Sequence, residues 1–239
     1  MKQDEPGFYE HVAQAYAETV DSKPIHQYYE RPNTWSLLPQ NLEGLAICDI
    51  GCGSGWYTQQ LVKQGADVTA VDASEKLLNY AQTRIGSSAT FLQADISKPL
   101  DMLDKASFDI IIAPLVVHYI SNWNRLFSEF ARILKPNGIL TLSLPHPHMV
   151  YDLFELDSYF CKTVISDYWE GVGASVSFYH HTLHELSQTL YWSSFTIEMM
   201  LEPEPDSKLS EQQTLYDQMK SKPWFLFVRC RKQITLGVK

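Results

Sequence analysis

Three glycines at alternate positions form the stretch of this sequence with the clearest chemical meaning. Residues 48–57 have the sequence CDIGCGSGWY, so Gly51, Gly53 and Gly55 follow directly after Asp49. Glycine at this spacing opens the backbone to close approach by a ligand. A helix that begins just beyond the loop would present free N–H groups, which favour an anionic group such as a carboxylate. We therefore predict a ligand site at these glycines, with Asp49 supporting the loop from behind.

The spacing of the glycines does not fit the two common nucleotide-binding loops. The dinucleotide fingerprint G-x-G-x-x-G needs its third glycine one place later, where this chain has Trp56. The phosphate loop needs Lys-Ser or Lys-Thr after its last glycine, and neither follows. Two acids, Asp72 and Asp95, end later segments of strand composition. Because an acid at the first of these places accepts hydrogen bonds from a ribose diol, and the second could meet an adenine amino group, the pattern describes a pocket for a nucleoside with an amino-acid tail.

Strand and helix patterns alternate around these residues. Apolar or β-branched segments predict five strands, over 45–50, 67–72, 89–95, 107–114 and 139–145. Helical spacing predicts helices over 56–65, from Ser74 onward and over 124–134, and the sequence KPNG is expected to break the last of them before its strand. This alternation predicts an α/β fold with a doubly wound parallel sheet and helices on both faces. Ligands in such sheets bind beyond the carboxyl ends of the strands.

Beyond the fifth predicted strand the alternation of strand and helix patterns stops. Residues 146–180 are rich in aromatic side chains and poor in helical periodicity, so we expect a lid-like insertion over the ligand cleft, with an idle surface excursion as the alternative. Thr182 and Glu185 then form a capping box that predicts the start of a helix. Strand patterns return at 195–201 and 224–230, joined by a polar stretch of helical composition. They predict an antiparallel pair that closes one edge of the sheet.

Composition argues against several classes of protein. The 239 residues include 19 basic and 28 acidic side chains, a net charge of −9, so no broad positive field would attract nucleic acid. No run approaches the roughly 18 apolar residues of a membrane span, and the acidic N-terminus does not resemble a secretion signal. Four cysteines without a framework spacing indicate a reducing compartment. We expect one cytoplasmic domain over residues 1–239, with neither nucleic acid nor a membrane as partner, and with its oligomeric state left open.

The ordered motifs resemble those of the class I S-adenosylmethionine-dependent methyltransferases. They are the glycine loop DIGCGSG, then AVDAS, QADIS, FDIIIAPLVVHYI and LKPNGILTLSLPHP, followed by a tail that is similar to the ending of the bacterial small-molecule branch called type 11. The resemblance covers about residues 9–230. It implies a Rossmann-like sheet of seven strands, mostly parallel, with the last strand antiparallel. It also implies S-adenosylmethionine as cofactor and a small molecule as methyl acceptor.

The resemblance further implies roles for individual residues. The glycine loop would lie under the methionine part of the cofactor, Asp72 on the ribose, Asp95 at the adenine, and Pro114 with Leu115 near the sulfonium. A helical cover over residues 1–40 would close over the site. The cofactor-binding residues that we expect are Tyr16, Gly51, Gly53, Gly55, Tyr57, Asp72, Ala73, Leu77, Ala94, Asp95, Ile96, Pro114 and Leu115.

The eight histidines raise the question of a metal ion or a general base. His180, His181 and His184 suggest ligands at helical spacing, but the predicted helix start leaves His180 outside the helix, and we expect no metal site. His118 and His146 follow the predicted fourth and fifth strands, at the edge where an acceptor would meet the methyl group. An imidazole titrates in the range useful for a base. They are our candidate catalytic residues, with a structural role for either as the alternative.

Two other functions fit the same motifs. A nicotinamide-dependent oxidoreductase can use a similar sheet, although the early third glycine argues against it. A module that binds the cofactor without turnover would keep the same pocket. The favoured hypothesis is an enzyme that transfers a methyl group from S-adenosylmethionine to an oxygen, nitrogen or carbon atom of a small acceptor. The sequence does not identify that acceptor.

Overall fold

The computed structural model describes residues 8–169 and 173–234, so parts of the expected N-terminal cover (1–7) and of the expected insertion (170–172) lie outside the described residues. The main strands are β1 (Ala46–Ile50), β2 (Asp67–Asp72), β3 (Thr90–Gln93), β4 (Phe108–Pro114), β5 (Leu134–Pro145), β8 (Phe195–Leu201) and β9 (Phe225–Lys232). The helices are α1 (Phe8–Thr19), α2 (Arg31–Ser36), α3 (Trp56–Lys63), α4 (Glu75–Ile85), α5 (Trp123–Ile133), α6 (Pro147–Leu153), α7 (Leu183–Trp192) and α8 (Gln213–Ser221).

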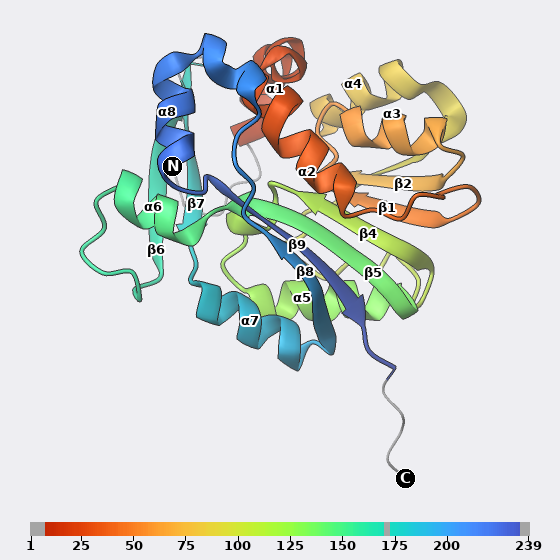
Figure 1. The fold of residues 1–239 in the computed structure, drawn as a ribbon. Coiled ribbons are helices and arrows are strands. Elements are labelled where there is room, and N and C mark those ends of the chain that lie inside the picture. The colour runs from red at the N-terminus through yellow and green to blue at the C-terminus, as the bar shows by residue number, and fades with distance from the viewer. Residues whose placement is uncertain (1–7, 170–172, 235–239) are drawn as a thin grey trace.

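Seven strands form one sheet in the order β3-β2-β1-β4-β5-β9-β8. The pairs β1–β2, β2–β3, β1–β4 and β4–β5 are parallel. In Figure 1, α2, α3 and α4 lie on one face of this sheet, and α5 and α7 lie on the other. The direction in which successive strands are added reverses between β1 and β4. Such a reversal leaves a crevice beyond the carboxyl ends of these two strands, which is where ligands bind in open α/β sheets.

The predicted antiparallel pair closes the sheet, and the last strand in the chain is the antiparallel one. β9 pairs antiparallel with both β5 and β8, so it lies one place inside the edge. Burial explains this order: Phe225–Val228 of β9 are buried, whereas most of β8 is at least partly exposed. The strand with the apolar run therefore takes the covered position, and β8 becomes the edge.

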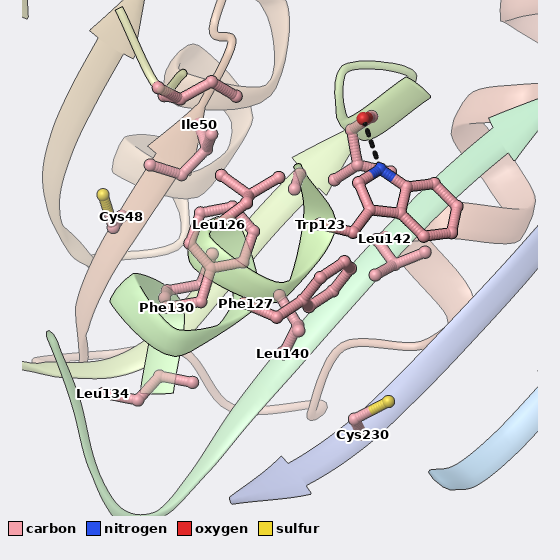
Figure 2. Close-up of a cluster of buried hydrophobic side chains, with 14 of the residues drawn as sticks. Cys48, Ile50, Trp123, Leu126, Phe127, Phe130, Leu134, Leu140, Leu142 and Cys230 are labelled. Carbon is pink, nitrogen blue, oxygen red and sulfur yellow. Dashed lines mark hydrogen bonds between the residues drawn. The ribbon is translucent and has the colours of Figure 1, made fainter. Parts of the chain in front are cut away.

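Alternate residues of β1 supply two apolar cores, one on each face of the sheet. Cys48 and Ile50 join the cluster under α5 and α7, shown in Figure 2. Ile47 joins the cluster under α3 on the other face. Within the first cluster the indole of Trp123 donates a hydrogen bond of 2.8 Å to the carbonyl oxygen of Val117, which satisfies its one buried polar atom. A strand buried on both faces explains why its sequence is a continuous apolar run rather than an alternation.

The structure corrects the sequence analysis at two places. β5 begins at Leu134, directly after α5, so KPNG lies inside the strand instead of before it. The pairing register shifts there, between Phe108 and Ile110, and Asn137 takes a positive φ of 62°. Such a bulge accommodates turn-forming residues without ending the strand.

The second correction concerns the region where no regular elements are predicted. It contains α6 and an antiparallel hairpin of β6 (Thr163–Trp169) with β7 (Ala174–His180). The sequence did not reveal the helix because it has only two turns, with Pro147 in the first. β7 alternates, with Val176, Phe178 and His180 buried, but β6 does not, because the polar Ser166 and Asp167 stand next to each other in its middle.

This inserted region has its own apolar cluster. Met149 and Val150 of α6 pack with Ile165 and Phe178 of the hairpin. The ring of Tyr119, in the turn that follows β4, packs against the same cluster. The insertion is therefore anchored next to the carboxyl end of β4, beside the crevice.

Candidate functional site

A cavity lies at the carboxyl ends of β1 and β4. Its wall is formed by the glycine loop, by the residues that end β4 and by the N-terminal segment around the short π-helical turn His26–Glu30. Of the cofactor-binding residues expected from sequence, the wall contains Tyr16, Gly51, Gly53, Tyr57, Pro114 and Leu115. It also contains residues that the sequence analysis did not select, chiefly His26, Glu30, Arg31 and Trp56.

Two of the three loop glycines are required by packing within the protein itself. A Cβ on Gly51 would lie 2.5 Å from Cγ2 of Val116, just past β4. A Cβ on Gly55 would lie 2.8 Å from Cβ of Ala81 in α4. Both glycines have positive φ, at +69° and +84°. The close approach that sequence analysis assigned to a ligand is therefore, at these two positions, an approach of neighbouring segments.

Gly53 is the loop glycine with the least crowded Cβ position, and its N–H bonds to Asp72 at the end of β2. A Cβ on Gly53 would meet only the ring of Tyr16, at 3.5 Å. The carboxylate of Asp72 accepts hydrogen bonds from the N–H of Gly53 at 2.8 Å and from the N–H of Ser74 at 2.9 Å. Burial raises the pKa of Asp72, and these backbone N–H groups oppose the shift. Each carboxylate oxygen keeps a lone pair for a further donor such as a ribose hydroxyl.

Helix α1 docks on the first turn of α4, next to Asp72. The Glu10 carboxylate accepts the Ser74 hydroxyl at 2.8 Å and the N–H of Lys76 at 3.2 Å. Ser74 in turn accepts the N–H of Leu77 and so caps α4. The side chain of Leu77 is buried under the helix, not in the cavity. The contacts of Glu10 hold the N-terminal segment over the end of β2.

The remaining predicted cofactor residues lie outside the cavity wall, at the ends of β2 and β3 or on α4. Asp95 accepts the N–H of Ser97 at 2.9 Å and pairs with Lys98 at 3.3 Å. Burial acts to raise the pKa of Asp95, but the hydrogen bonds of Ser97 outweigh it and the net shift is downward. Ala94 and Ile96 are buried in the core beneath. The predicted residues that the cavity wall does not include are Gly55, Asp72, Ala73, Leu77, Ala94, Asp95 and Ile96.

Glu30 is the residue of the cavity that sequence analysis missed most clearly. Its carboxylate is buried and accepts hydrogen bonds from the hydroxyls of Thr34, Ser143 and Tyr57, at 2.8, 2.8 and 2.9 Å. Burial raises the pKa of Glu30, and the three hydroxyls act against that rise. Two of the partners lie 113 and 27 residues away along the chain, so no local pattern marks this site.

Arg31 follows Glu30 and is held by other groups. Its guanidinium forms an ion pair of 2.6 Å with Asp21 and stacks over the ring of Trp56, with 4.3 Å to the ring centre. Asp21 also pairs with Arg84 of α4. The N-terminal segment is thus joined to the body of the protein by a charge cluster at the rim of the cavity.

His118 lies near the cleft but outside the cavity wall. Its buried ring packs against Tyr119 and against Phe178 of the insertion, with centroid distances of 4.2 and 5.5 Å. Burial lowers the pKa of His118 to about 3, and nearby His181 adds to the shift. The Nδ1 atom of His118 is buried without a hydrogen-bond partner among the described residues.

Both ring nitrogens of His146 are engaged. Nδ1 accepts the N–H of His148 and so caps α6, and Nε2 donates to Glu202 at 2.7 Å. Burial lowers the pKa of His146, partly offset by Glu202. Of the histidines considered as metal ligands, His181 bonds to Glu185 and to the carbonyl oxygen of Ile120. Within residues 8–169 and 173–234 no group of three His, Cys, Asp or Glu side chains is arranged to hold a metal ion.

Comparison with known proteins agrees with this geometry. Residues 48–142 match the family model of a methyltransferase domain of type 11. A solved S-adenosylmethionine-dependent methyltransferase from Mesorhizobium loti is similar in structure, with 28% identity and a TM-score of 0.75 over 87% of this chain and 100% of that chain.

Two curated relatives extend the comparison. A protein of Haemophilus influenzae is 28% identical over 96% of both chains. The malonyl-[acyl-carrier protein] O-methyltransferase of Halalkalibacterium halodurans is 34% identical over 47% of this chain, and the chain spans 44% of that relative's length.

The fold, the glycine site and these matches define the class. Residues 48–142 form a methyltransferase domain, the chain has the fold of the class I S-adenosylmethionine-dependent methyltransferases, and S-adenosylmethionine is its cofactor. The residues present fit that compound: an acid ends β2 where a ribose would lie, only Tyr16 lies within 4 Å of a Cβ added at Gly53, and the cavity wall includes Glu30 and Arg31. The family, the fold class and the cofactor predicted from sequence are confirmed.

Proposed function

We propose that the protein transfers the methyl group of S-adenosylmethionine to a small-molecule acceptor that enters the cleft beside residues 146–180. The observation that carries the proposal is the cavity at the switch point between β1 and β4, with Asp72 ending the neighbouring strand. S-adenosylmethionine, when bound, supplies a methyl group that is already activated by its sulfonium. The protein then has to hold donor and acceptor in line and to exclude water, which can lower a barrier by ~7–11 kcal/mol.

The predicted cofactor residues keep their roles in this proposal. Gly53 and Asp72 would hold the methionine part and the ribose, and Asp95 the adenine. Leu115 supports a position near the reacting centre, because its backbone has a φ of 46° and is fixed by hydrogen bonds from its N–H to the carbonyl oxygen and hydroxyl of Ser143. A non-glycine residue in that region is strained and is often found at functional sites.

The acceptor would lie under the inserted region. The hairpin and α6 of the inserted region form one apolar cluster with Tyr119, which lies in the turn that follows β4. Residues 1–40 would act as the cover on the other side, since Tyr16 faces the loop and Glu10 docks on α4. Because the relative from Halalkalibacterium halodurans is an O-methyltransferase, we propose an oxygen acceptor as the first to be tested.

General-base catalysis by His118 or His146 remains part of the proposal. His118 has the unbonded ring nitrogen, but a pKa of about 3 makes it a weak base. His146 would have to release either the cap of α6 or Glu202 before its ring could accept a proton. We therefore infer that alignment contributes more to the rate than proton removal does.

The proposed compartment is the cytoplasm, and the proposed partner is the small acceptor alone. All four cysteines are free thiols, which fits a reducing environment. In the part of the chain that the structure describes, every helix is too short or too polar to cross a bilayer.

Calorimetric titration tests the cofactor half of the proposal. The protein should bind S-adenosylhomocysteine and should not bind NAD. Asp72→Asn should weaken binding by roughly 10- to 100-fold, the loss expected for hydrogen bonds to a charged group. Asp67→Asn is the matched control, because Asp67 opens the same strand at its exposed opposite end. NAD binding without S-adenosylhomocysteine binding would favour the oxidoreductase instead.

Methyl transfer to a panel of oxygen, nitrogen and carbon acceptors tests the catalytic half. Turnover of any member, abolished or strongly reduced in Asp72→Asn, is the expected result. If the cofactor binds but none of a broad panel is methylated, the alternative of a binding module without turnover is favoured. His118→Gln and His146→Gln, assayed with the acceptor that is turned over, would show whether either ring removes a proton from it.

A further inference from the structure

The strongest unexplained feature of the cavity is a buried carboxylate. Glu30 is part of the cavity wall and is 2% exposed. Its Oε1 accepts the hydroxyls of Thr34 and Ser143, and its Oε2 accepts the hydroxyl of Tyr57. These three donors come from α2, β5 and α3, so the carboxylate is fixed from three sides. Because Oε2 accepts a single bond, it keeps a lone pair for another donor.

Among the described residues no cation forms an ion pair with this carboxylate within 4 Å. The charge of the adjacent Arg31 acts to lower the pKa of Glu30, but its guanidinium is bonded to Asp21 and stacked on Trp56. His26, also in the wall, has a pKa lowered to about 4 by burial and is neutral at pH 7. A buried charge without a partner is unfavourable, and hydroxyl donors compensate only part of its lost hydration. The cavity is therefore suited to a ligand that brings a positive group with N–H donors.

The methyl donor, S-adenosylmethionine, carries a positive group with N–H donors at the end that would lie at the glycine loop. Glu30 shares its cavity with Gly51, Gly53 and Ser54 of that loop. The amino-acid end of S-adenosylmethionine bears an α-ammonium with three N–H donors, whereas its sulfonium has none. We propose that Glu30 binds the α-ammonium group of the methyl donor and thereby selects compounds with an intact amino-acid end. This role of Glu30 rests on the proposed function only because S-adenosylmethionine is taken as the methyl donor.

Ligands that differ by one group test this without any variant. The probes are S-adenosylhomocysteine, its analogue without the amine, 5′-S-(3-carboxypropyl)-5′-thioadenosine, and its analogue without the carboxylate, 5′-S-(3-aminopropyl)-5′-thioadenosine. Calorimetry with the full-length protein should show that loss of the amine weakens binding about 10- to 100-fold, the range for a charge-assisted hydrogen bond. Equal binding of S-adenosylhomocysteine and the amine-free compound would overturn the proposal while leaving the cofactor itself established.

Glu30→Gln then shows which residue causes the discrimination. The variant should lose affinity for the two amine-bearing compounds and keep its affinity for the amine-free one, so that the ratio falls to within about threefold. Glu10→Gln is the control: it weakens the docking of α1 and should affect all three compounds alike. A uniform loss in Glu30→Gln would mean that Glu30 only supports the fold, and it would refute the proposal. No binding of S-adenosylhomocysteine to the wild-type protein would refute both this assignment and the proposed function.

Discussion

Replacing Gly51 by alanine is the sharpest test of how the glycine loop is built. The added Cβ would lie 2.5 Å from Cγ2 and 2.8 Å from Cβ of Val116, distances that real Cβ atoms do not show. The backbone there has a φ of +69°, which costs an L-residue about 1–2 kcal/mol. Overpacking at a rigid site adds about 1–3 kcal/mol. Gly51→Ala should therefore lower the free energy of unfolding by roughly 2–5 kcal/mol.

Two further variants separate these contributions. Gly44 has a similar φ of +73° with no atom within 4 Å of its added Cβ, so Gly44→Ala should show the backbone cost alone. In the double variant Gly51→Ala with Val116→Ala, the clash with the valine methyl groups is relieved, whereas the 2.8 Å contact with Cβ of residue 116 and the backbone cost remain. The coupling energy between positions 51 and 116 should then equal the part of the steric cost that comes from the methyl groups, at most about 1–3 kcal/mol.

Urea unfolding followed by tryptophan fluorescence measures Gly51→Ala, Gly44→Ala, Val116→Ala and the double variant against the wild-type protein. The slope of free energy against urea should be unchanged, so that midpoint shifts report stability. If Gly51→Ala costs no more than Gly44→Ala, or if Val116→Ala gives no recovery, then the loop does not need glycine for packing against β4. The need for glycine at position 51 would in that case come from the close approach of a ligand.

Two other predictions concern buried and paired charges. Because His118 has a folded pKa of about 3 and an unfolded value near 6.5, the unfolded chain binds the extra proton, so stability is lost as pH falls from about 6.5 towards 3, by at most ~1.4 kcal/mol per pH unit. Unfolding midpoints measured over this range should fall less steeply for His118→Gln, and parallel curves would contradict the assignment. Asp21→Asn breaks the pairs with Arg31 and Arg84, and limited proteolysis should cut the N-terminal segment several-fold faster with little change in global stability. An unchanged cleavage rate would show that these pairs do not hold the segment.

The sequence determined the architecture because its signals are local. Apolar runs located β1 and β4, and the capping box located α7, where the Thr182 hydroxyl accepts the N–H of Glu185 at 3.0 Å. The spacing of loop glycines and Asp72 located the ligand end of the sheet, because the carboxyl ends of parallel strands meet at one edge. The pairing of β6 with β7 was not predicted, since Ser166 and Asp167 interrupt the pattern of β6 and the alternation of β7 extends over only seven residues.

Only the tertiary structure decided what each chemical group does. Glycine is required at position 51 because Val116, in the loop that follows β4, packs against it. His146 is engaged by Glu202, which lies 56 residues away in the sequence. The carboxylate of Glu30, a residue of the cavity wall, is held in place by hydroxyls up to 113 residues distant. The hydrophobic periodicity of a segment shows which of its side chains are buried. It can be read from residues that are neighbours in the sequence. The hydrogen bonds of a buried polar group depend on segments that the fold brings together. These partners are distant in the sequence, so no local pattern identifies them.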